Sequence, residues 1–171
     1  MKTLYLIGGP MGVGKTAVGQ QRKRDLPSSV FLDGDWCWDA DPFQVTPETK
    51  TMVLDNICYM LNNFLHCTAY ENVVFSWVMH DQAILDAILS RLDRRSCRTL
   101  CVSLLTDEET LRARLEADIA RGLRTPDVIG RSLDRLPLYA GLSTHKLDTT
   151  GKTVPEVAAA LRALEPELPA R

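Results

Sequence analysis

Short apolar runs alternate with longer amphipathic segments along most of the 171-residue chain. The runs are rich in residues that favour strands and are bounded by turn-forming or charged positions, which is typical of buried strands. We expect five such strands, at Thr3–Ile7, Val30–Asp35, Asn72–Val78, Thr99–Leu105 and His145–Asp148.

The segments between these runs carry apolar residues at helical spacing. The first helix should begin near Lys15 and end before Pro27. Later helices should start at N-caps or capping boxes, namely Thr46, Asp81, Thr106 with Glu109, and Thr153 with Glu156. The alternation predicts an α/β fold, a doubly wound five-stranded parallel sheet with helices on both faces. We expect one domain over residues 1–171, with residues 165–171 as a frayed tail.

Composition and charge narrow the class of protein. The formal net charge of −2 argues against a protein that coats nucleic acid, so no nucleic-acid partner is expected. No apolar run approaches the roughly 20 residues of a membrane span, and the N-terminus lacks a signal-peptide pattern. The five cysteines include no CxxC pair, which favours reduced thiols. We therefore expect a cytoplasmic protein with no membrane partner, either a monomer or a homodimer.

The strongest chemical signal is GPMGVGKT, residues 9–16, which fits G-x-x-x-x-G-K-[ST] between a predicted strand and a predicted helix. Its glycines let successive backbone N–H groups turn toward one anion, and the helix N-terminus adds its positive end. Lys15 should reach the β- and γ-phosphates of a nucleotide, and Thr16 should place its hydroxyl on Mg²⁺. We name residues 9–16 the phosphate loop and expect nucleotide contacts from Gly9, Pro10, Met11, Gly12, Val13, Gly14, Lys15, Thr16 and Ala17.

This loop resembles that of the P-loop NTPases, and the resemblance implies binding of ATP and Mg²⁺ and the three-layer fold of that superfamily. In FLDGD, Asp33 and Asp35 stand two residues apart, so both carboxylates should point to one side at the strand's carboxyl end. The stretch resembles the second strand of small-molecule kinases such as the gluconate and shikimate kinases. By that resemblance Asp33 lies near the metal and Asp35 binds or deprotonates the acceptor hydroxyl. Two solvated turn aspartates are the alternative interpretation.

The third strand has no acid where a metal-binding aspartate of P-loop ATPases would follow it. Its end reads FSWVMHD, and Asp81 comes so late that it suits a helix N-cap better. The chain also lacks the N-K-x-D motif that binds guanine. These absences argue against motor ATPases and GTPases, and they leave the metal to Thr16 and Asp33.

Arginines recur along ARGLRTPDVIGRSLDRLPLY, which resembles the lid of adenylate-type nucleotide kinases. By that resemblance a short lid spans residues 122–128, and Arg124, Arg131 and Arg135 clamp the transferring phosphoryl group. Guanidinium groups suit a charge spread over several oxygens. Arginines on a solvated helix face are the alternative. In the same kinases the loop at Thr150 and Gly151 passes the adenine ring, and a plain strand–turn–helix joint is an equal alternative.

The acceptor pocket should lie beside the two aspartates, lined by Asp33, Asp35, Trp36, Trp38 and His80. Indole rings stack on flat ligands and histidine binds polar groups, although packing within the protein is the competing interpretation for all three. No arginine occurs between positions 35 and 72, and the single lysine there is Lys50. A doubly anionic acceptor would require more positive charge.

These features together favour a P-loop kinase that transfers the γ-phosphoryl group of ATP–Mg to a hydroxyl of a small molecule. The small-molecule substrate would be a nucleoside, a sugar or an antibiotic-like alcohol. A nucleoside monophosphate kinase, a non-catalytic nucleotide-binding or regulatory ATPase module, and a polynucleotide 5′-kinase are the alternatives.

Overall fold

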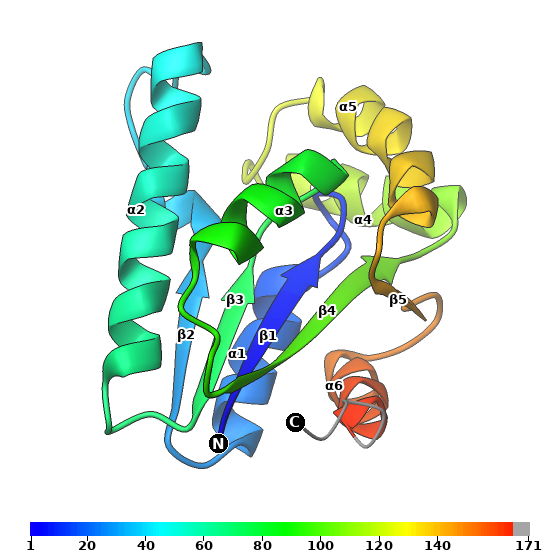
Figure 1. Ribbon diagram of the computed structural model, residues 1–171. Helices are drawn as coiled ribbons and strands as arrows, with labels where there is room; N and C mark the ends of the chain where they lie inside the picture. The colour runs from blue at the N-terminus through cyan, green and yellow to red at the C-terminus, as the bar shows by residue number, and fades with distance from the viewer. Residues whose placement is uncertain (166–171) are drawn as a thin grey trace.

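The computed structural model describes residues 1–165 and contains a five-stranded parallel sheet in the order β2-β3-β1-β4-β5. The strands are β1 (Lys2–Gly8), β2 (Ser29–Asp33), β3 (Asn72–Ser76), β4 (Cys97–Leu105) and β5 (His145–Asp148). Because all five run in one direction, their carboxyl ends share one edge of the sheet (Figure 1). The predicted α/β sheet is confirmed, and the loop after β1 lies at the edge where such folds bind ligands.

Helices cover both faces of this sheet. They are α1 (Lys15–Asp25), α2 (Pro47–His66), α3 (Gln82–Arg91), α4 (Glu108–Ala120), α5 (Val128–Arg135) and α6 (Val154–Ala163), with 3₁₀ turns η1 (Gly34–Cys37) and η2 (Leu136–Gly141). Helices α1 and α6 pack on one face and α2 and α3 on the other, while α5 lies beyond the carboxyl edge of the strands (Figure 1). None of the helices within residues 1–165 has the length and apolarity to cross a membrane.

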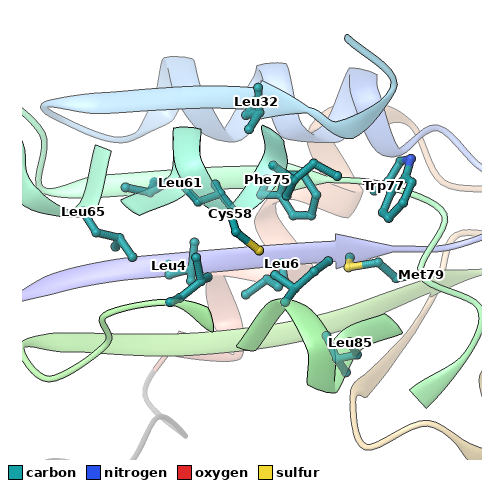
Figure 2. Packing of buried hydrophobic residues seen from close by; sticks show 14 of the residues in the cluster. Leu4, Leu6, Leu32, Cys58, Leu61, Leu65, Phe75, Trp77, Met79 and Leu85 are labelled. Atoms are coloured by element: carbon teal, nitrogen blue, oxygen red, sulfur yellow. The ribbon is translucent and has the colours of Figure 1, made fainter. Parts of the chain in front are cut away.

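Alternation along β1 builds the two cores. Leu4 and Leu6 point to the side of α2 and α3, and Tyr5 and Ile7 point to the side of α1 and α6; all four are at most 2% exposed. Figure 2 shows the first of these clusters, with Phe75 of β3 among residues of α2 and β1. A strand buried on both faces needs apolar residues at every position, which is why the short runs are so apolar.

Most helix starts agree with the sequence, and one does not. Thr46 accepts a hydrogen bond from the backbone N–H of Thr49, and Asp81 accepts one from Ala83. The prediction of Thr106 as the cap of α4 was wrong, because Asp107 accepts the bond from the Thr110 N–H at 2.7 Å. A charged carboxylate is the stronger partner for an exposed N–H group at a helix N-terminus.

Two predicted segment ends also differ. β2 ends at Asp33 instead of Asp35, and β3 ends at Ser76 instead of two residues later. Glu165, expected in a frayed tail, forms an ion pair with Arg22, which is only 2% exposed. A buried guanidinium needs a partner, and Glu165 supplies it. The rest of the predicted tail lies outside the described residues.

A packing prediction follows from α1, where Gly19 lies against Phe31 of β2. A Cβ atom on Gly19 would lie 3.0 Å from Phe31 Cδ2, in a core that cannot expand freely. We expect Gly19→Ala to lower the unfolding free energy by about 1–2 kcal/mol, because overpacking outweighs the better helix propensity of alanine. Gly130→Ala in α5 is the matched control: a Cβ there meets nothing within 4 Å, so stability should rise by up to about 1 kcal/mol. Urea unfolding of both variants measures the difference, and a stabilised Gly19→Ala would contradict it.

Candidate active site

The phosphate loop connects β1 to α1 and is shaped by glycines. Gly9 and Gly14 have φ angles of 147° and 99°, which disfavour any residue with a Cβ atom. A side chain on Gly9 would also lie 2.7 Å from the Leu104 carbonyl oxygen. Gly14 is the N-cap of α1, so the loop amides and the helix N-terminus converge beside Lys15. This arrangement fits a phosphate anion.

Lys15 folds back over this loop. Its ammonium donates a hydrogen bond to the Pro10 carbonyl oxygen at 2.9 Å. Burial lowers the pKa of Lys15 to about 8; the nearby carboxylates of Asp35 and Asp33 oppose that shift, while Arg124 and Arg135 add to it. The charge of Lys15 therefore interacts with both predicted acids and with two of the three predicted arginines, Arg124 and Arg135. Cationic and anionic side chains therefore lie together at the place where the terminal phosphate of a bound triphosphate would lie.

Asp33 is linked to α1, to the neighbouring strand β3 and to the turn η1. Its Oδ2 accepts a hydrogen bond from the Thr16 hydroxyl at 2.6 Å and a longer one of 3.4 Å from Ser76. Its Oδ1 accepts from the backbone N–H of Asp35 at 3.1 Å. The side chain is only 6% exposed, so these donors offset the cost of burying its charge.

The prediction that Asp33 and Asp35 lie together at the end of one strand was wrong. Asp35 is not part of β2 and lies in the turn η1, which begins directly after Asp33. The Asp33 side chain caps this turn, and the chain bends before strand alternation can apply. Asp35 still lies close enough to Lys15 to influence its pKa, so the turn brings about the proximity that the strand was expected to give.

Thr16 and Asp33 offer a hydroxyl and a carboxylate oxygen 2.6 Å apart, the hard oxygen donors that Mg²⁺ prefers. Within residues 1–165 no group of three or more His, Cys, Asp and Glu side chains is arranged to hold a metal ion. A cation between Thr16 and Asp33 would take its remaining ligands from phosphate oxygens and water, as Mg²⁺ commonly does. The residues present therefore fit Mg²⁺ bound together with a nucleotide.

The predicted lid forms the loop between α4 and α5, and its arginines separate into two groups. Arg124 donates from Nε to Asp118 at 3.1 Å and from a terminal nitrogen to the sulfur of Met11 at 3.6 Å, which holds it beside the phosphate loop. Arg135 lies near enough to affect Lys15. Arg131 instead forms a 2.8 Å ion pair with Asp127, and both side chains are more than half exposed.

The segment after α5 is attached to the backbone beside the phosphate loop. The Tyr139 hydroxyl, in η2, donates to the Val78 carbonyl oxygen at 2.6 Å, and burial raises the pKa of this phenol. The same carbonyl accepts a 3.4 Å bond from the N–H of Gly9. One backbone oxygen thus joins the segment after α5 to the first residue of the phosphate loop.

A cavity of about 260 Å³ adjoins the phosphate loop on the side of α6. Its walls are Gly12, Val13, Gly14, Val18, Arg114, Thr149, Lys152, Thr153, Val154 and Val157. The predicted base-contacting residues stand beside it: the Thr150 hydroxyl bonds Thr106 and the N–H of Asp107, and Gly151 turns with φ of 68°. A larger hollow of about 490 Å³ lies at the opposite edge, where Lys2 already donates to carbonyl groups at the end of α2.

Arg114 is a residue that the sequence did not single out. Its guanidinium donates to the Val13 carbonyl at 3.3 Å and to the Thr149 hydroxyl and carbonyl, both at 3.2 Å. It therefore joins the phosphate loop to the loop after β5. It lies six residues before the arginine-rich segment 120–139, and spacing along a helix does not say which face meets another loop.

The aromatic residues after Asp35 have different surroundings. Trp36 is 56% exposed and meets the edge of Phe31. Trp38 packs edge-to-face between Phe43 and Trp77. The Nδ1 atom of His80 is buried without a hydrogen-bond partner, and burial, followed by Arg135, lowers the pKa of the imidazole. Trp36 therefore faces solvent near the acids, and Trp38 serves packing.

Comparison with known structures agrees with this geometry. The fold resembles a gluconokinase from Sinorhizobium meliloti 1021, with 19% identity, a TM-score of 0.68, and coverage of 96% of this chain and 94% of that chain. It also resembles the Deinococcus radiodurans tunicamycin resistance protein (23% identity, TM-score 0.69, 95% of each chain). A shikimate kinase from Acinetobacter baumannii, in complex with shikimate, has 22% identity and a TM-score of 0.64 over 98% of this chain and 94% of its own. At these identities the likeness is one of fold.

No curated protein matches the chain in sequence. A family model described as an AAA domain matches residues 6–124, which is more than half of the chain and includes the phosphate loop, both acids and Arg124. The chain therefore belongs to this AAA-domain family, and it is a P-loop NTPase with the architecture of the small kinases.

Proposed function

We propose that the protein transfers the γ-phosphoryl group of ATP to a hydroxyl group of a small molecule. The observation that carries the proposal is the position of Asp35, an exposed carboxylate close to Lys15 at the mouth of the phosphate loop. Asp33 already supplies the carboxylate that suits Mg²⁺ beside Thr16, and a second carboxylate with no cation on it would repel a triphosphate. The position of Asp35 suits a group that accepts or orients the proton of an acceptor hydroxyl.

The other residues take roles that follow from their positions. The loop amides and Lys15 hold the phosphates, and Thr16 with Asp33 would hold Mg²⁺. Mg²⁺ supplies charge neutralisation between the phosphates when it is bound. Arg124 and Arg135, the two arginines that affect Lys15, offset the charge that develops on the transferred group.

The acceptor class follows from charge on the other side of the site. The connection from η1 into α2 contains Asp35, Asp39, Asp41 and Glu48 and no arginine or lysine before Lys50. A phosphate-bearing acceptor would be repelled there, so an uncharged alcohol is favoured over a nucleoside monophosphate. The similar folds of a gluconokinase, a shikimate kinase and a tunicamycin resistance protein support a small-molecule kinase.

The first experiment measures ATP consumption over a panel of nucleosides, sugars, hydroxyl-bearing antibiotics and nucleoside monophosphates. Turnover with an uncharged alcohol is expected, and Asp35→Asn should reduce it by about 10²-fold or more while ATP affinity is retained. Asp25→Asn, an exposed acid at the end of α1, is the matched control and should keep full activity. Turnover on nucleotides alone would indicate a nucleoside monophosphate kinase, and ATP binding without transfer would indicate a regulatory module.

A second experiment uses the lowered pKa of Lys15. At pH 9 the empty site holds this lysine mainly neutral, because its pKa is about 8. Triphosphate charges favour the ammonium, so binding should take up about one proton at pH 9 and much less at pH 7. Affinity should therefore fall as pH rises above 8. Calorimetry of MgATP binding in buffers of different ionisation enthalpy measures the uptake, and Lys15→Met should abolish it and weaken binding. Equal uptake in the variant would refute the assignment.

A further inference from the structure

The end of β3 supplies hydrogen-bond donors to the two aspartates. Ser76 lies opposite Asp33 in the register of β2 and β3, so the next residue, Trp77, lies alongside the turn η1. The Trp77 indole Nε1–H donates to Asp35 Oδ1 at 3.1 Å. Other P-loop proteins carry an acid after the third strand. At that point this chain has a tryptophan whose indole N–H donates a hydrogen bond to an acid, Asp35.

The Trp77 ring is held firmly enough to fix what it touches. The side chain is 9% exposed and belongs to the cluster on the α2 and α3 face, and Figure 2 shows it at one end of that cluster, beyond Phe75. Trp38 packs edge-to-face on it, with ring centroids 5.9 Å apart. The Trp77 backbone N–H also donates to the Ile7 carbonyl at 3.2 Å, which ties the residue to β1.

Gly34 makes this contact possible. A Cβ atom on Gly34 would lie 2.6 Å from Trp77 Cδ1 and 2.9 Å from Trp77 Cβ. Any larger residue would push the ring away from the turn, and the indole nitrogen would lose Asp35. The glycine between the two aspartates is therefore matched to the tryptophan that directly follows the neighbouring strand, β3.

We propose that Trp77 is a positioning residue for Asp35, an inference that rests on the proposed kinase function. Asp35 is exposed and lies on a turn of four residues, so its carboxylate would otherwise rotate freely. The indole N–H fixes Oδ1 and thereby sets the direction of Oδ2, the oxygen left for an acceptor hydroxyl. A hydrogen bond to a charged group is worth enough to select one orientation, and small errors in orientation slow group transfer strongly.

The hydrogen bond itself is tested by NMR on the full chain. The protein has three tryptophans, so a ¹⁵N spectrum should show three indole N–H signals, and Trp77→Phe identifies one by its loss. We expect the Trp77 signal to exchange slowly with solvent and to shift and lose protection in Asp35→Ala. If the chemical shift and the exchange rate of the Trp77 signal are unchanged in Asp35→Ala, the proposal is overturned.

The functional role is tested by kinetics with MgATP, first with water as the acceptor and then with the alcohol of the panel that is turned over fastest. Trp77→Phe keeps an aromatic ring but removes the donor, and we expect kcat to fall about tenfold with little change in acceptor KM or ATP affinity. Phe75→Leu is the matched control, because it removes buried packing two residues earlier in the chain, on β3, and leaves the indole in place. It should lower Tm without the same loss of kcat.

The outcomes separate the two proposals. If Asp35→Asn abolishes transfer while Trp77→Phe keeps full kcat, the positioning role fails and the kinase proposal stands. If Asp35→Asn keeps full transfer to the alcohol, the role of Asp35 and the positioning role of Trp77 both fail, whereas the kinase activity stands; if no alcohol is turned over by the unaltered protein, the kinase proposal fails. Should Trp77→Phe destabilise the fold, replacing Trp77 by its sulfur isostere, 3-benzothienylalanine, removes only the N–H. Full activity in that protein, or equal kcat losses in Trp77→Phe and Phe75→Leu, would contradict the positioning role.

Discussion

The site depends on the buried carboxylate of Asp33. It receives hydrogen bonds from Thr16 at the start of α1, from the backbone of Asp35 in η1 and from Ser76 at the end of β3. A negative charge that is 6% exposed is tolerated because donors from three segments surround it. This one group therefore sets how the phosphate loop, the acid-bearing turn and the third strand meet, and the rest of the chemistry depends on that junction.

Local sequence rules predicted the elements well. The bounds of β5 agree to the residue, α1 begins at Lys15 as expected, and the phosphate loop lies between a strand and a helix. Each of these depends on residues close together in the chain, such as glycines with positive φ or a cap beside its helix. The pattern therefore contained the information needed for them.

Contacts between segments that are distant in the sequence could not be predicted from the local pattern. Nothing in the spacing of Asp33 and Asp35 signalled that the strand would end between them, because the turn is stabilised by a side chain acting on its own backbone. Arg114 bridges two loops, and Trp77 contacts Asp35 from the segment that follows β3. Arg131 matched the lid pattern as well as Arg135 did. Arg131 pairs locally with Asp127, four residues earlier, whereas the tertiary fold brings Arg135 close enough to Lys15 to affect its pKa.

The charges divide the site into two halves. Lys15, Arg124 and Arg135 gather on the side of the phosphate loop, and acidic residues populate the connection from η1 into α2. In the proposed reaction the phosphoryl group would pass from the cationic half to the acidic half. An uncharged acceptor would thereby become an anion in the half that disfavours anions, which would promote release of the product.

The bond from Tyr139 to the Val78 carbonyl also constrains motion. Because that oxygen is shared with the N–H of Gly9, the segment after α5 is anchored to the backbone that opens the phosphate loop. This bond therefore limits how far Arg135, four residues earlier in the chain, can move away from the phosphate loop.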